Sequence, residues 1–126
     1  MSDKKFTVLA VDDDMINLKL LKSMLLKTPE VGEVIEAKNG ADAIGILKSR
    51  TDIDLVLLDI IMPVMGGIEV LKVVRADDNL LAMPIIVLTT DETKKTEALE
   101  SGANGFLMKP VRASDLIHKI SELVNV

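Results

Sequence analysis

Acidic, hydroxyl and amino side chains follow four apolar stretches of the chain, each at the point where the stretch ends. They are Asp12, Asp13 and Asp14 after the first stretch, then Asp59, Thr89 and Lys109. If the stretches are parallel strands of one sheet, their carboxyl ends lie at the same edge and these side chains come together there. Four matching strand ends favour one functional site over a set of unrelated helix caps and turn residues.

Clustered carboxylates repel one another, by about 1 kcal/mol for a pair about 4 Å apart in water and by several times more at a lower dielectric constant. A hard divalent cation removes this repulsion, and an all-oxygen ligand set favours Mg²⁺, with Mn²⁺ as a substitute. An ammonium group and a hydroxyl beside such a cation form a site for a doubly negative phosphoryl group. A carboxylate there is a candidate nucleophile that forms an aspartyl phosphate.

The segments that must position these groups alternate between strand and helix patterns five times. A uniformly apolar run such as Leu55–Leu58 predicts a strand buried on both faces of a parallel sheet. The predicted strands are residues 6–11, 33–37, 53–58, 85–88 and 105–108. Helices are predicted after the Asp triplet, over 41–50, 68–76 and 92–101, and from Ser114 onward. The fold class is therefore α/β, one parallel sheet with helices on both faces joined by right-handed crossovers.

Spacing and capping signals predict how the helices begin, end and pack. An Asp of the triplet caps the first helix, whose predicted inner face carries Ile16, Leu20, Leu21, Met24 and Leu25. Ser114 is the predicted cap of the last helix, whose predicted inner face carries Leu116, Ile117, Ile120, Leu123 and Val124.

Two segments are predicted to be less firmly packed than the others. Strand 33–37 is short and polar, which is typical of a sheet edge. The helix over 92–101 has only Ala98 and Leu99 as apolar residues, and Gly102 is placed to end it. A thinly anchored helix of this kind is a candidate mobile element.

Composition excludes several classes of protein. The formal net charge of −5 and the pI near 4.8 argue against direct binding to nucleic acid or to an anionic membrane. The absence of Cys and the presence of a single His exclude thiolate catalysis and multi-His metal sites. The N-terminus is not typical of a signal peptide and no stretch is long enough to span a bilayer, so we expect a cytoplasmic protein.

An ordered set of motifs carries a family resemblance. Val11-Asp12-Asp13, Asp59 with Met62-Pro63 and Gly66-Gly67, Thr89, and Lys109-Pro110 together resemble the receiver (phosphoacceptor) domain of two-component response regulators, including the single-domain chemotaxis-type regulators. The resemblance runs from Val8 to Val124. It implies a flavodoxin-like (βα)5 fold with strand order 2-1-3-4-5, and a single receiver domain over residues 1–126 with no output domain.

The resemblance also implies roles for the strand-end residues. Asp59 accepts a phosphoryl group from a phosphohistidine, and Lys109 pairs with a phosphoryl oxygen. Asp13 and Asp59 bind Mg²⁺ directly, Asp12 binds it mainly through water, and the backbone carbonyl of Ile61 completes the protein ligands.

Switching in the resembling family depends on a hydroxyl and an aromatic side chain. Thr89 moves to bond the phosphoryl group, and the space it leaves lets Phe106 turn inward. The face made by the fourth helix, fifth strand and fifth helix then changes its preference for partners. The Lys109–Pro110 bond is expected to be cis.

The implied partners are a sensor histidine kinase or phosphotransfer protein upstream, and a protein or effector domain downstream. The protein is then a monomer or a phosphorylation-dependent dimer. It is a signalling switch rather than an enzyme, catalysing only its own phosphorylation and slow dephosphorylation.

Four residues around the predicted site bear on how the switch works and on how long the phosphoryl group lasts. Phe106 lacks a hydroxyl, so any switch there works by packing alone, and Thr90 is larger than the residue common at its position. Ile61 and Asp91 flank the phosphoryl group. Because an apolar Ile61 cannot orient an attacking water, we expect a long-lived phosphoryl group.

Two other classes of protein are weighed against this interpretation. A Mg²⁺-dependent aspartyl-nucleophile phosphatase would use Asp12, but the motif after the first strand fits poorly and Asp59 would have no role. A flavin carrier would need a hydroxyl- and glycine-rich first loop and aromatic side chains, which the sequence lacks.

Overall fold

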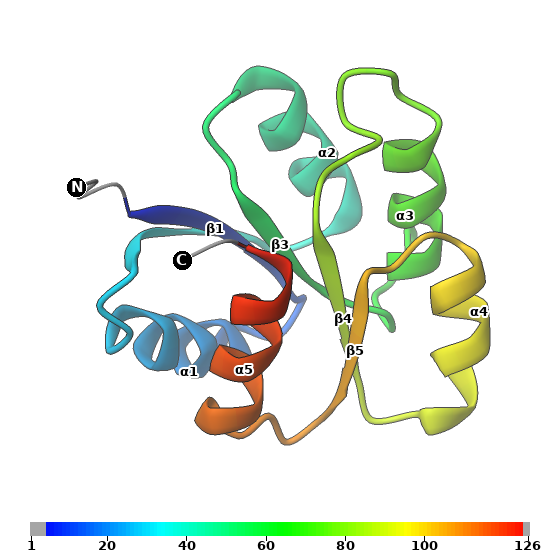
Figure 1. Cartoon of the computed structure of the whole chain (residues 1–126). Helices are drawn as coiled ribbons and strands as arrows, with labels where there is room; N and C mark the ends of the chain where they lie inside the picture. The colour runs from blue at the N-terminus through cyan, green and yellow to red at the C-terminus, as the bar shows by residue number, and fades with distance from the viewer. Residues whose placement is uncertain (1–4, 125–126) are drawn as a thin grey trace.

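Five parallel strands form one sheet in the order β2-β1-β3-β4-β5 within residues 5–124, the part of the chain that a computed structural model describes (Figure 1). The strands are β1 (Phe6–Val11), β2 (Val31–Ala37), β3 (Leu55–Asp59), β4 (Ile85–Thr89) and β5 (Gly105–Met108). Every neighbouring pair is parallel. The fold is therefore the flavodoxin-like α/β sandwich that the family resemblance implied.

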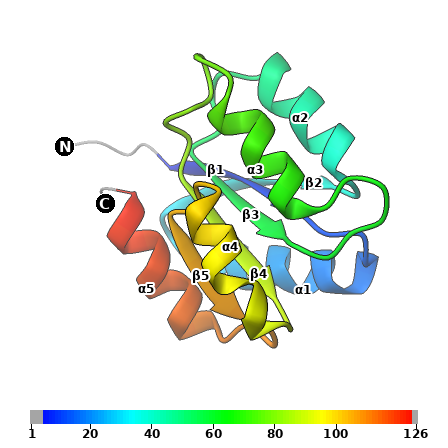
Figure 2. The same ribbon diagram turned by 90° about the vertical axis from the view of Figure 1, so that its right-hand side faces the viewer.

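Helices cover both faces of the sheet, as Figures 1 and 2 show. They are α1 (Met15–Leu26), α2 (Gly40–Ser49), α3 (Gly67–Arg75), α4 (Lys95–Glu100), which follows the 3-10 turn η1 (Glu92–Lys94), and α5 (Ala113–Leu123). One buried cluster joins the sheet to α2, α3 and α4, and a second joins it to α1 and α5. None of the helices within residues 5–124 has the length and hydropathy of a membrane span.

The central strands are buried along their whole length, because helices cover them on both sides. All residues of β3 and β4 are buried. β2 lies at the edge of the sheet as predicted, but it starts at Val31 and its seven residues exceed the six of β1. The prediction of a short strand was wrong, because Val31 pairs with Phe6 of β1 and the exposed Gly32 after it gives no strand signal.

The predicted inner face of α1 is confirmed at Leu21 and Leu25 but wrong at Ile16 and Leu20. Leu18, Leu21 and Leu25 are buried, whereas Ile16 and Leu20 are 72% and 55% exposed. Apolar residues surround most of this helix, so spacing alone does not choose the packed face. The N-cap does match: the side chain of Asp14 accepts the backbone N–H groups of Ile16 and Asn17.

The start of α5 also differs from the prediction. Arg112 occupies the N-cap position without a side-chain hydrogen bond, and Ser114 lies inside the helix. Leu116 and Ile120, four residues apart, face the sheet, and Ile117 is turned away and 40% exposed. Packing of the Leu116–Ile120 pair thus positions this helix without a polar cap. Residues 1–4, part of the N-terminus judged unlike a signal peptide, lie outside the described residues.

Candidate functional site

Three carboxylates meet at the carboxyl ends of β1 and β3. Asp12 and Asp13 follow β1, Asp59 ends β3, and one oxygen from each lies within 4.8 Å of the others. The two strands are neighbours in the sheet, with Val11 opposite Leu58, and this pairing brings the carboxylates together. An all-oxygen donor set of this size fits a hard divalent cation.

Lys109, which follows the edge strand β5, reaches the same point. The Nζ atom of Lys109 lies 2.8 Å from Oδ2 of Asp12 and 3.3 Å from Oδ1 of Asp59. The other oxygen of Asp12 accepts the backbone N–H of Asp14 at 2.9 Å, so both of its oxygens have donors. The Lys109–Pro110 peptide bond is cis, as the family resemblance implied.

Burial sets the electrostatics of the cluster. It raises the pKa of Asp59 to about 6, because Lys109 only partly offsets the lost hydration and Asp12 adds a second negative charge. Burial alone would lower the pKa of Lys109, but its hydrogen bond to Asp12 and the charge of Asp59 hold that pKa above its ordinary value. The described site therefore carries more buried negative charge than its single ammonium group balances.

Two glycines allow the following helix to pack directly on the end of β3. The N–H of Gly67 donates to the carbonyl of Ile60 at 2.8 Å. A Cβ at Gly67 would lie 2.5 Å from the backbone oxygen of Asp59, and one at Gly66 would lie 3.0 Å from that of Ile60. In the sequence these glycines contribute only to the motif that carries the family resemblance, so this contact was missed.

The predicted switch residues lie where the site meets the face covered by α4. Thr89 is 1% exposed, and its Oγ1 accepts the N–H of Asp91 at 3.1 Å. Because side chains alternate along a strand, the side chain of Thr89 lies on the same face of β4 as that of Val87. The half-buried Phe106, opposite Val87 on β5, packs on this face as well. Asp91 caps η1 through the N–H of Thr93, and Thr90 is exposed.

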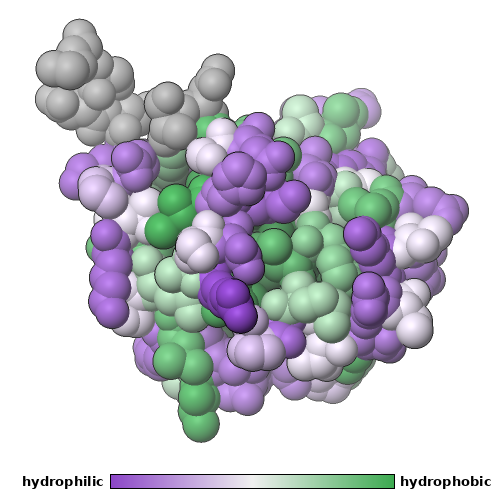
Figure 3. Space-filling view, turned by 60° about the horizontal axis from the view of Figure 1, so that its bottom comes forward, coloured by the Kyte–Doolittle hydropathy of each residue, from purple (hydrophilic) through white to green (hydrophobic). Residues whose placement is uncertain are grey.

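The loop after β3 borders the site with exposed apolar side chains. Ile61 is 55% exposed and Val64 is fully exposed, with a positive φ of 68° that is unusual for a β-branched residue. Figure 3, in which the lower edge of Figure 1 comes forward, shows apolar and hydrophilic side chains mixed on this face. The role of the Ile61 carbonyl as a metal ligand stays a prediction.

The fold and this arrangement define a class: a doubly wound α/β protein with an acidic site and one lysine at the carboxyl ends of its strands. Residues 8–121 match the response regulator receiver domain, and the chain belongs to that family. Thr89, Lys109 and the three carboxylates all fall within the matched range.

Relatives and solved structures agree with this assignment. Chemotaxis protein CheY-3 of Vibrio cholerae is 33% identical over 123 residues, which cover 96% of this chain and 93% of that protein. A CheY homolog of Campylobacter jejuni is 32% identical over 119 residues, covering 93% and 91%. Both matches span nearly the whole of each chain.

Two solved structures show the same architecture. CheY4 of Vibrio cholerae has a TM-score of 0.86 at 31% identity, covering 95% of this chain and 99% of that one. The receiver domain of sensor histidine kinase PA1611 from Pseudomonas aeruginosa has a TM-score of 0.85 at 26% identity, covering 97% and 99%. That domain was solved with a magnesium ion coordinated in its active site cleft.

Proposed function

We propose that this protein is a phosphorylation-dependent signalling switch that accepts a phosphoryl group on Asp59. The donor is a phosphohistidine of a sensor histidine kinase or of a phosphotransfer protein. The observation that carries the proposal is the buried carboxylate of Asp59, 3.3 Å from the ammonium group of Lys109 and next to Asp12 and Asp13.

The chain supplies the nucleophile and part of the charge compensation. An oxygen of Asp59 attacks the phosphorus atom, the P–N bond breaks, and its electron pair stays on the imidazole nitrogen, which takes up a proton. Lys109 then pairs with a phosphoryl oxygen. Mg²⁺, or Mn²⁺ in its place, held by Asp12, Asp13, Asp59 and the Ile61 carbonyl, would neutralise the charge on the phosphoryl oxygens.

Thr89 connects the phosphoryl group to the partner-binding face. Its oxygen accepts the N–H of Asp91, so its own proton is available to a phosphoryl oxygen. When Thr89 moves, Phe106 gains room on the same face of the sheet. The surface formed by α4, β5 and α5 presents the exposed apolar side chains of Leu99 and Met108. We propose it as the surface for a downstream protein, or for a second copy after phosphorylation.

The test is phosphorylation by a small phosphoramidate donor in the presence of Mg²⁺, measured by intact mass. Wild-type protein should gain the mass of one phosphoryl group, and Asp59→Asn should gain none. Asp78→Asn, which changes an exposed carboxylate after α3, is the matched control and should behave as wild type. Phosphorylation of Asp59→Asn to the wild-type level would contradict the proposal.

The alternative phosphatase would use Asp12 as its nucleophile. Both oxygens of Asp12 already accept donors, one from the N–H of Asp14 and one from Lys109, and the residue is 1% exposed. Lys109 also contacts Asp59, but at 3.3 Å against 2.8 Å for Asp12, so the Asp59 oxygen is the more available nucleophile. These contacts favour Asp59 as the acceptor.

A further inference from the structure

Arg75, at the end of α3, joins two loops on the side of the molecule away from the carboxylates. Its Nε donates to the carbonyl of Gly102 at 2.9 Å, one Nη to the carbonyl of Leu81 at 3.0 Å, and the other Nη to Oδ1 of Asn104 at 2.8 Å. The same oxygen of Asn104 accepts the N–H of Ile85, the first residue of β4. The guanidinium thus links α3 to the start of β4 and to the loop after α4.

The loop after α4 is shaped to fit this arginine. Gly102 has a φ of +114°, and a Cβ there would lie 2.6 Å from Cγ of Arg75. The N–H groups of Gly102 and Ala103 bond the carbonyls of Leu99 and Ala98, which ends the helix. The end of α4 remote from the carboxylates is therefore fixed by directed hydrogen bonds, and the side chain of Arg75 is buried enough that its pKa is lowered.

The rest of α4 is held much less firmly. Of residues 92–100 only Ala98 is buried, and Leu99 is 42% exposed. An open groove separates α3 from α4, with Lys72, Thr93 and Glu97 among its lining residues. In Figure 2 this helix, coloured yellow, lies in front of β4 and β5. At its other end α4 follows the turn η1, whose N-cap residue Asp91 donates its N–H to the Thr89 hydroxyl.

We propose that Arg75 is a positioning residue that anchors the remote end of α4, so that a change at Thr89 moves the other end of the helix in a defined direction. This inference rests on the proposed function. A helix held only by Ala98 and by its Thr89 end would sample many positions whether or not Asp59 carries a phosphoryl group. With Arg75 in place, loss of the bond between Thr89 and Asp91 repositions α4 as a unit.

The test is hydrogen exchange of the amides in residues 92–103, with and without beryllium fluoride and Mg²⁺ as a phosphoryl mimic. In wild-type protein the mimic should change exchange in this segment. In Arg75→Gln the segment should exchange about tenfold faster before the mimic is added, and the change on adding it should be lost. Phosphorylation of Asp59 by a small phosphoramidate, measured by mass in separate samples without beryllium fluoride, should match wild type.

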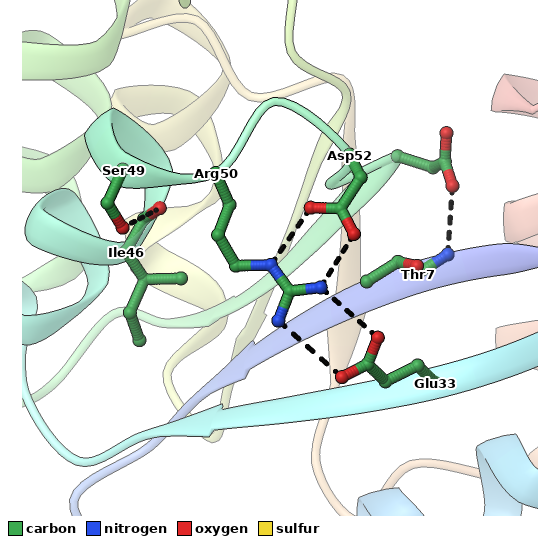
Figure 4. A network of polar contacts seen from close by, with 7 residues as sticks. Thr7, Glu33, Ile46, Ser49, Arg50 and Asp52 are labelled. Carbon is green, nitrogen blue, oxygen red and sulfur yellow. Dashed lines mark hydrogen bonds and ion pairs between the residues drawn. The ribbon is translucent and has the colours of Figure 1, made fainter.

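Two further variants separate anchoring from general stability and from charge. Arg75→Lys keeps the positive charge but cannot make three directed bonds, so it should behave as Arg75→Gln. Arg50→Gln removes the hydrogen bonds to Asp52 and Glu33, which are drawn in Figure 4. Because these bonds do not involve α4, this variant should keep the wild-type response.

Uniformly faster exchange in all strands of Arg75→Gln, with an intact response of residues 92–103, would overturn the inference. So would a wild-type response in Arg75→Lys. If wild-type protein neither accepts a phosphoryl group nor responds to the mimic, the proposed function itself fails, and this result is distinct because it does not depend on Arg75.

Discussion

Two charge clusters lie at opposite ends of the sheet strands, and they differ in how far their positive and negative charges compensate each other. At the carboxyl ends of the strands, Asp12 and Asp59 are buried around Lys109. Near the start of β3, Arg50 binds Asp52 and Glu33 in contact with water (Figure 4). Both clusters place one cation between two carboxylates, and the first has Asp13 as a third.

The pKa values show what separates the two clusters. The hydrogen bond from Arg50 lowers the pKa of Asp52, so partner and solvent together favour the charged form. Burial raises the pKa of Asp59 in spite of Lys109, so its charge is under-compensated. A buried charge that the fold leaves unbalanced indicates a site for a ligand, whereas a balanced exposed cluster indicates a structural contact.

Removal of the single cation of the buried cluster should have the largest effect on stability. Lys109→Met leaves Asp12 and Asp59 facing each other without compensation, and we expect the free energy of unfolding to fall by about 3 kcal/mol without Mg²⁺. Urea unfolding measures it. Arg50→Met, the equivalent change in the exposed cluster, should cost far less. Equal losses for the two variants would remove the distinction between the clusters.

Addition of a methyl group next to the end of β3 should have the second-largest effect on stability. Gly67→Ala forces Cβ against the backbone of Asp59, and we expect a loss of about 2 kcal/mol and slower phosphorylation. Gly45→Ala is the matched control, since nothing lies within 4 Å of its Cβ and it is inside α2. That change should stabilise the protein by about 0.5–1 kcal/mol. Thermal melts and the phosphorylation assay report both effects.

Removal of one negative charge from the site should have a smaller effect on stability, and this effect should depend on Mg²⁺. Asp13→Asn removes one like-charge repulsion, and we expect about 1 kcal/mol of added stability without Mg²⁺. Millimolar Mg²⁺ should raise the melting temperature of wild-type protein, because the cation binds only the folded state, and should leave Asp13→Asn unchanged. Asp52→Asn should retain the wild-type response. An Mg²⁺-independent melting temperature in all three proteins would contradict the metal site.

The smallest effect is expected at the mouth of the site. Ile61→Asn places a group there that can orient water, so the phosphoryl group should be lost a few-fold faster than from wild-type protein. The decay of labelled protein after removal of the donor measures this rate. An unchanged or slower decay would show that Ile61 does not set the phosphoryl lifetime.

The sequence predicts the site better than it predicts the packing around it. Asp12, Asp59 and Lys109 could be brought together in advance, because parallel strands end at the same edge and each of these residues follows an apolar run. The inner face of α1 could be predicted only in part. Leu21 and Leu25 are buried as expected, but Ile16 and Leu18 are both apolar, and only contact with the sheet separates them. Gly67 packs on Asp59, and Arg75 bonds Gly102 and Asn104. No rule of sequence spacing predicts that these residues lie close together.

The central claim is that the phosphoryl group resides on Asp59 because this carboxylate is the under-compensated member of the buried cluster. Peptide mapping of wild-type protein labelled by a small phosphoramidate tests it directly. We predict that the label lies on Asp59 and that Arg50→Gln does not change its position or yield. Label on Asp12, or on an exposed carboxylate such as Asp52, would contradict the account.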